Sequence, residues 1–138
     1  MNREERFEAI ALTRAADIAP LADAVPADTA VTILRGPTVG MVMVQARESV
    51  EGLRFNVGEA LVTEALVAIG PHQGYAMVQG MEREIALAGA ICDAAVEAGH
   101  PATPHILALL IAANERIAAA HRADWAKVAG TRVAFDEM

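Results

Sequence analysis

The chain has 138 residues, of which 54% are hydrophobic, and its eleven Lys and Arg against eighteen Asp and Glu give a net charge of −7. This length suits a single domain over residues 1–138, and the acidic balance argues against nucleic-acid binding, which needs a basic surface. The longest apolar stretch, residues 106–113, is far shorter than the roughly 20 residues that cross a bilayer.

The single cysteine, Cys92, excludes an internal disulfide, and the charged N-terminus lacks the apolar core of a signal peptide. Both features predict a cytoplasmic protein. The mean hydropathy of +0.32 is high for a soluble monomer. Because a domain this small cannot bury all of its apolar residues, we expect part of its surface to bind a partner.

Residues 3–25 are predicted to form an N-terminal helix, because their apolar side chains recur at helical spacing. These side chains are Phe7, Ile10, Ile18, Leu21 and Val25. Pro20 is expected to interrupt or restart the helix, since proline lacks the N–H that a continuing helix needs.

The middle of the chain predicts about four strands, mostly antiparallel. The strand-like runs are residues 31–35, 39–47, 59–69 and 75–79. The polar segment 48–58 is predicted to be a loop. The run 59–69 fits a strand or a helix by pattern alone, but the loop that follows it, residues 70–74 with glycine at each end, favours a hairpin.

The last third is predicted to be helical, over residues 82–99 and from Thr103 to about residue 128. Gly99 stands where the first of these helices would end, and Thr103 followed by Pro104 suits the start of the second. The expected fold class is therefore α+β, with a small, mostly antiparallel sheet of about four strands covered by an N-terminal helix and two C-terminal helices.

Arg35 and Arg47 end two adjacent predicted strands, which makes them candidates for anion binding. Two guanidinium groups near one sheet edge could hold a phosphate through paired donors. The alternative is that both are solvated strand ends, or partners of Glu48 and Glu51.

Asn56 and Glu59 are candidate binding or interface residues in the predicted loop Phe55–Glu59. Gly58 allows a positive φ there, and the Asn and Glu side chains could orient a ligand or a neighbouring subunit. The alternative is an ordinary turn anchored by a buried Phe55.

The sequence predicts no catalytic residue and no metal site. The four histidines are His72, His100, His105 and His121. They are scattered and lack the spacing of metal ligands. The G-x-S-x-G, P-loop and G-x-G-x-x-G motifs are also absent.

Short motifs in a fixed order link much of the chain to a known family. They are Leu34–Pro37, Gly40-Met41, Val44–Arg47, Phe55–Glu59, Val62-Thr63, Gly74-Tyr75, Gly80, Ile91–Ala94 and, in the tail, Thr131–Phe135. Together they resemble PhnG, a subunit of the bacterial carbon–phosphorus lyase system for phosphonate use. No single motif is specific, but the ordered set covers most of the chain.

The resemblance implies an accessory or structural subunit that joins PhnH-, PhnI- and PhnJ-like subunits in a symmetric core complex. With other components, that complex takes MgATP as substrate and displaces adenine by a phosphonate, which gives a ribose 1-phosphonate 5-triphosphate. A radical enzyme subunit cleaves the carbon–phosphorus bond later, after loss of pyrophosphate. Because the family's catalytic residues are credited mainly to the other subunits, this chain alone is expected to bind no cofactor.

Glu51, Glu64 and Glu82 depart from the family pattern. At the corresponding places the family usually has a Gly-Thr-Gly loop, an arginine after the threonine, and a Gly-Arg-Asp at the end of the last strand. The usual Phe-Thr-Met run near the C-terminus is reduced to Asp136–Met138. Several of these exchanges remove positive charge or add negative charge, which opposes binding of an anionic phosphonate or triphosphate.

A second hypothesis is a free-standing homo-oligomer that reuses the same scaffold and binds a small anion through Arg35, Arg47 and Asn56. The acidic exchanges at Glu51 and Glu64 weaken it. An independent hydrolase ranks last, because no nucleophile–base pair is found.

Overall fold

The computed structural model describes residues 1–136, and all of their side chains except those of residues 15, 16, 18, 19, 22 and 127–136. Its elements are α1 (Arg3–Ala11), α2 (Ala15–Ala24), β1 (Thr32–Arg47), β2 (Arg54–Ile69), β3 (His72–Gln79), α3 (Arg83–Glu97) and α4 (Thr103–Asp136). The expected α+β class, with an antiparallel sheet, is confirmed.

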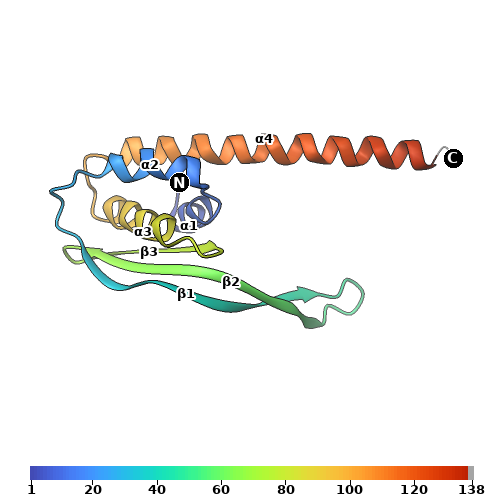
Figure 1. Ribbon diagram of the computed structural model, residues 1–138, viewed down its shortest axis with the longest axis horizontal. Helices are drawn as coiled ribbons and strands as arrows, with labels where there is room; N and C mark the ends of the chain where they lie inside the picture. The colour runs from blue at the N-terminus through green and yellow to red at the C-terminus, as the bar shows by residue number, and fades with distance from the viewer. Residues whose placement is uncertain (137–138) are drawn as a thin grey trace.

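The helices cover one face of the sheet in two layers (Figure 1). The strand order is β1-β2-β3. α3 packs on β2 and β3, with α1 beside it on β3, and α2 and α4 form the second layer above them. Within residues 1–136 no helix covers the opposite face of the sheet (Figure 1).

Small side chains let α3 lie close to the sheet. Ala90 and Ala94 are fully buried on its inner face. A Cβ atom on Gly74 of β3 would lie 2.2 Å from the backbone oxygen of Ala90 and 2.2 Å from the backbone nitrogen of Ala94, so only glycine fits there. The four largest fully buried side chains come from the other three helices and are Ile10, Leu21, Ile106 and Leu110.

A buried ion pair joins α1 to α3. The Arg6 guanidinium donates to the carboxylates of Asp93 and Glu97, and the side chains of Arg6 and Asp93 are only 5% and 4% exposed. The second carboxylate oxygen of Asp93 accepts the backbone N–H of Tyr75 at 2.9 Å. Asp93 therefore connects α1, α3 and the edge strand β3.

Three strands replace the expected four, because the predicted runs 31–35 and 39–47 belong to one strand. β1 pairs with β2 from its first residue, opposite Ala68, to its last, opposite Arg54. The register shifts just before Arg35 and again across Gly36-Pro37, where Gly36 has a φ of 76°. The chain thus passes this dipeptide as a local irregularity, since the long β2 supplies partners on both sides of it.

Both connections in the sheet are shorter than predicted. The strands β2 and β3 pair up to the residues that flank Gly70-Pro71, so the turn has two residues rather than five. Gly70 has a φ of 60°, which suits the first position of such a turn. The connection between β1 and β2 spans residues 48–53 only, because residues 54–58 continue β2.

The predicted N-terminal helix is two helices, and the break precedes Pro20, which lies within α2. The chain turns at Arg14, whose extended backbone starts α2, and the Thr13 hydroxyl donates to the Ala9 carbonyl at 3.2 Å beside the break. The side chain of Ile18, part of the predicted stripe, lies outside the described residues.

α4 runs to Asp136 instead of ending near residue 128. No proline follows residue 128, and a single glycine weakens a helix without ending it. The side chains of the tail motif Thr131–Phe135 lie outside the described ones. None of the described helices is both long and apolar enough to span a membrane.

Candidate functional site

The two candidate arginines lie near opposite ends of β1 and do not meet. Arg35 pairs in register with Leu66, and Arg47 pairs with Arg54. At about 3.3 Å per residue, the two lie on the order of 35–40 Å apart along the strand. The expectation that they end two adjacent strands at one sheet edge is therefore wrong, because both belong to a single strand.

Arg35 is part of a polar cluster on the sheet with Glu64 and Tyr75. Arg35 Nη1 lies 3.1 Å from Glu64 Oε1, and the Tyr75 hydroxyl donates to Glu64 Oε2 at 2.7 Å. The hydrogen bond from Tyr75, together with Arg35, lowers the pKa of Glu64. The Tyr75 ring stacks on Phe7 of α1, with ring centroids 5.9 Å apart. The acidic departure at Glu64 thus has a structural partner, and it neutralises Arg35.

Tyr75 should stay protonated at a pH where ordinary tyrosines ionise. Burial, and then the Glu64 carboxylate, raise the pKa of Tyr75 to about 12. Because this folded-state pKa lies above that of the unfolded chain, the resulting stability is present below about pH 10 and is lost as the pH rises through the folded-state value. Tyr75 is the only tyrosine, so phenolate absorbance reports it directly.

At about pH 10.5 we expect little Tyr75 phenolate in the wild-type protein and more in the variant Glu64→Gln. In that variant burial still raises the pKa of Tyr75, but the negative charge of Glu64 no longer does. Circular dichroism at the same pH verifies that the chain remains folded. If Tyr75 of the folded wild-type protein ionises near pH 10, the proposed effect of burial and Glu64 on its pKa would be wrong.

Asn56 and Glu59 lie in a strand, so the predicted loop Phe55–Glu59 is wrong. Asn56 Oδ1 accepts from the side-chain amide of Gln45 on β1 at 3.3 Å, and Glu59 pairs with Met43. Phe55 is 49% exposed, so the alternative of a turn anchored by a buried Phe55 is also wrong. Their predicted role at an interface stays a prediction, now attached to a strand surface.

Asn56 and Glu59 belong to a long hairpin arm, which comprises residues 41–61. β3 pairs with residues 62–69 of β2 only, so the arm is a two-stranded ribbon that extends beyond α1, α2 and α3 (Figure 1). Its exposed large apolar side chains are Met41, Val42, Met43, Val44, Val50, Leu53, Phe55, Val57 and Leu61. An isolated two-stranded hairpin is marginally stable in water, and this much exposed apolar surface marks a binding site.

The tip of the arm carries two arginines directly opposite each other. Arg54 pairs in register with Arg47, and neither forms an ion pair with a described carboxylate. Like charges opposite each other destabilise a strand pair, so a negatively charged group of a partner would relieve their repulsion. Arg54 carried no signal in the sequence, because only the register brings it beside Arg47.

α4 extends in the same direction as the arm and past the other helices (Figure 1). Its exposed apolar residues include Ile111 and Trp125, at 45% and 70% exposure. Two long projections with exposed apolar side chains therefore leave the same side of the folded body.

Several residues of the resembling motifs support the fold. The Thr63 hydroxyl donates to the Gly80 carbonyl at 2.6 Å and accepts the backbone N–H of Glu82 at 3.0 Å, which fixes the start of α3. Gly74 permits the close contact with α3, and Asp93 holds Arg6. These motif residues therefore preserve a scaffold, and they form no catalytic cluster.

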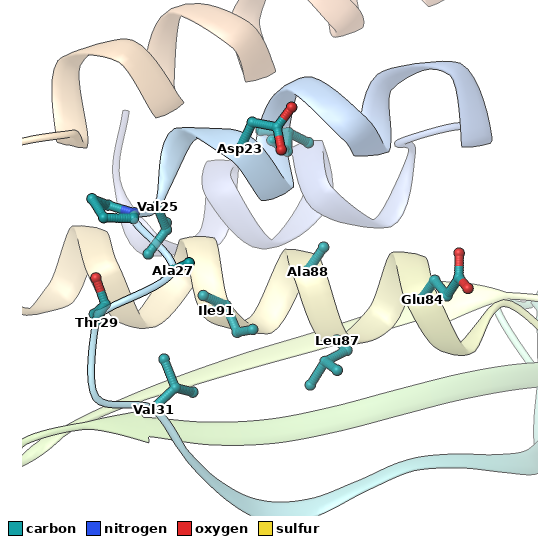
Figure 2. Close-up of a pocket in the computed structure, with 11 residues that line it drawn as sticks. Asp23, Val25, Ala27, Thr29, Val31, Glu84, Leu87, Ala88 and Ile91 are labelled. Carbon is teal, nitrogen blue, oxygen red and sulfur yellow. The ribbon is translucent and has the colours of Figure 1, made fainter.

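A large cavity, here called the α3 groove, lies between α3, the end of α2 and the segment 25–31 (Figure 2). Its volume is about 680 Å³, within the range of ligand-binding pockets. The α3 side of the groove is formed by Glu84, Leu87, Ala88 and Ile91, and most of the remaining lining is aliphatic.

The charges of the α3 groove do not suit an anion. Its two ionisable side chains are Asp23 and Glu84, both exposed, and no basic residue lines it. Carboxylates repel phosphate and phosphonate groups. Groups of His, Cys, Asp and Glu that could hold a metal are also absent from the described part of the chain.

Comparison with known proteins gives two matches. The model of the family described as "Phosphonate metabolism protein PhnG" matches residues 1–138. A protein of Rhizobium meliloti (strain 1021), named alpha-D-ribose 1-methylphosphonate 5-triphosphate synthase subunit PhnG, is 32% identical over 139 residues, which cover 99% of this chain and 88% of the relative.

Proposed function

Because this chain belongs to the PhnG family, we propose that it is a non-catalytic subunit of an assembly that makes a ribose 1-phosphonate 5-triphosphate. The rhizobial relative is named as a subunit of such a synthase. In this proposal PhnH-, PhnI- and PhnJ-like subunits are the partners, in the cytoplasm, and MgATP is a substrate of the whole assembly that this chain alone does not hold.

The exposed arm is the observation that carries the proposal. Its nine exposed large apolar side chains have exposures between 37% and 88%. Leaving such a surface in water forgoes about 25 cal/mol for each Å² of apolar area that a partner would cover. Subunits of permanent complexes commonly present large apolar interfaces, and α4 offers a second projection on the same side (Figure 1).

The electrostatics support a role apart from the chemistry. Arg35 is paired with Glu64, and the only ionisable groups of the α3 groove are carboxylates. A triphosphate or phosphonate would need cationic groups close together. The two arginines at the arm tip, Arg47 and Arg54, are such a pair, but they lie on an exposed ribbon without an enclosing pocket. We therefore assign them to subunit contacts.

The second hypothesis, a homo-oligomer that binds a small anion through Arg35, Arg47 and Asn56, has less support, because Arg35 and Arg47 are far apart on β1. It expects ATP or methylphosphonate to raise the melting temperature of the isolated protein in proportion to the logarithm of ligand concentration. An unchanged melting temperature across millimolar ligand would count against it.

The test of the proposed function is co-expression with the host's PhnH-, PhnI- and PhnJ-like proteins, capture through a tag on the PhnI-like protein, and native mass spectrometry of the product. We expect this chain in equal stoichiometry with its partners. Recovery of the partners without it, while the chain itself is folded and present in the lysate, would refute the proposal.

A further inference from the structure

The α3 groove has a surface chemistry that differs from that of the arm. Glu84, Leu87, Ala88 and Ile91 follow one another at helical spacing, so one stripe of α3 forms its wall. The side chains of Leu87 and Ile91 are partly buried against the core, and they also line the groove. The segment 25–31, which lines the groove, passes α3 at the end of the molecule opposite the arm tip (Figure 1).

The two carboxylates beside the aliphatic wall have no cationic partner. Neither Asp23 nor Glu84 forms an ion pair with a described side chain. Glu84 lies in the first turn of α3, where the helix dipole favours negative charge, but Asp23 lies at the C-terminal end of α2, where the same effect disfavours it. Local helix stability therefore does not account for Asp23.

We propose that the α3 groove binds one segment of a partner subunit, in which aliphatic side chains are flanked by lysine or arginine. The aliphatic side chains would cover Leu87, Ala88 and Ile91, and the basic groups would pair with Asp23 and Glu84 (Figure 2). This inference rests on the proposed function, because its occupant is part of the same assembly.

The charge and the shape of the groove favour this occupant over a metabolite. An anionic substrate would meet two carboxylates and no cation. A small neutral ligand would find Thr29 as the one uncharged polar side chain in the lining. A protein segment matches both features, because apolar anchors laid along a helix and a charged rim are the usual components of groove recognition.

The first test reverses both charges in Asp23→Lys/Glu84→Lys and repeats the capture through the tagged PhnI-like protein. The control is Glu5→Lys/Asp28→Lys, which changes the net charge equally. Glu5 lies in the first turn of α1, as Glu84 does in that of α3, and Asp28 lies in the segment 25–31 but does not line the groove. We expect the control to be retained as wild type and the groove variant to be retained at least tenfold less.

A second measurement does not depend on the folding of the charge-reversed variant. A cysteine introduced as Thr29→Cys, in the groove, should react with a maleimide at least tenfold more slowly in the assembly than in the free chain, whereas Glu5→Cys should react equally in both. Cys92 does not interfere, because its thiol is buried and burial raises its pKa to about 12.

The outcomes separate the two proposals. If the wild-type chain joins the assembly and the groove variant joins equally well, or if Thr29→Cys is labelled at the same rate in both states, the groove proposal is overturned and the proposed function stands. If the wild-type chain does not join, both fail together. A groove that instead binds a second copy of this chain would be recognised by self-association of the isolated wild type that Asp23→Lys/Glu84→Lys abolishes, and this result would also overturn the proposal.

Discussion

Asp93→Ala should lower the free energy of unfolding by about 3–5 kcal/mol, which is the usual cost of removing one partner from a buried ion pair. The substitution leaves the Arg6 guanidinium, 5% exposed, with only Glu97, whose side chain is 30% exposed. It also removes the acceptor of the Tyr75 backbone N–H. Domains of this size are commonly stable by only 5–15 kcal/mol, so denaturant unfolding should detect a large drop in the midpoint concentration.

The matched control is Arg3→Ala. Arg3 lies 3.9 Å from the same Glu97 but is 61% exposed, so its loss should cost less than about 1 kcal/mol. The double variant Arg6→Met/Asp93→Asn should lose less free energy of unfolding than the single variants Arg6→Met and Asp93→Asn lose together. The reason is that neither charge of the pair remains buried without its partner. An Asp93→Ala protein within 1 kcal/mol of wild type would contradict the role assigned to this pair.

The triple variant Met41→Thr/Met43→Thr/Phe55→Thr should weaken assembly with the partner subunits by about a hundredfold or more and leave the isolated chain folded. Threonine keeps a high strand propensity, and substitutions at exposed positions commonly change stability by less than about 0.5 kcal/mol. The three side chains are 60%, 57% and 49% exposed on the arm. Loss of a central interface side chain costs about 2 kcal/mol or more, and each 1.4 kcal/mol is tenfold in affinity.

Competition of tagged wild-type and untagged variant chains for a limiting amount of the PhnI-like partner measures this loss. The control is Leu12→Thr/Met81→Thr, which removes exposed apolar side chains outside the arm and α4. If the arm variant competes as well as wild type, the arm is not the interface. The proposed function would then need another contact surface.

The elements predicted well are those whose signals come from residues close together in the sequence. The helical spacing before Gly99 and the Thr103-Pro104 start correspond to α3 and α4, and the Gly70-Pro71 pair marks the hairpin between β2 and β3. The Gly36-Pro37 pair has the same appearance in the sequence, yet it lies within β1. It does not end the strand, because residues 64–68 of β2 pair with the chain on both sides of it.

The candidate site was predicted less well, since its residues meet only through contacts that are distant in sequence. Arg6 and Asp93 are 87 residues apart, and Arg35 finds Glu64 through the β1–β2 register. Arg47 and Asn56 do lie close together near the arm tip, but on paired strands and not at a sheet edge and a loop. The α3 groove, formed by α2, α3 and the segment 25–31, had no signal beyond the helical stripe of Leu87, Ala88 and Ile91.

The α+β class, the acidic charge, the ordered motifs of the family and the expectation of an apolar surface for a partner all follow from the residues alone. Where that surface lies depends on how the chain folds. The run of Val and Met in residues 39–47 has the composition of a buried strand. It is exposed in the folded chain because β1 and β2 have 16 residues each and β3 has eight, so the arm extends beyond the third strand and beyond α3, which packs on the rest of the sheet.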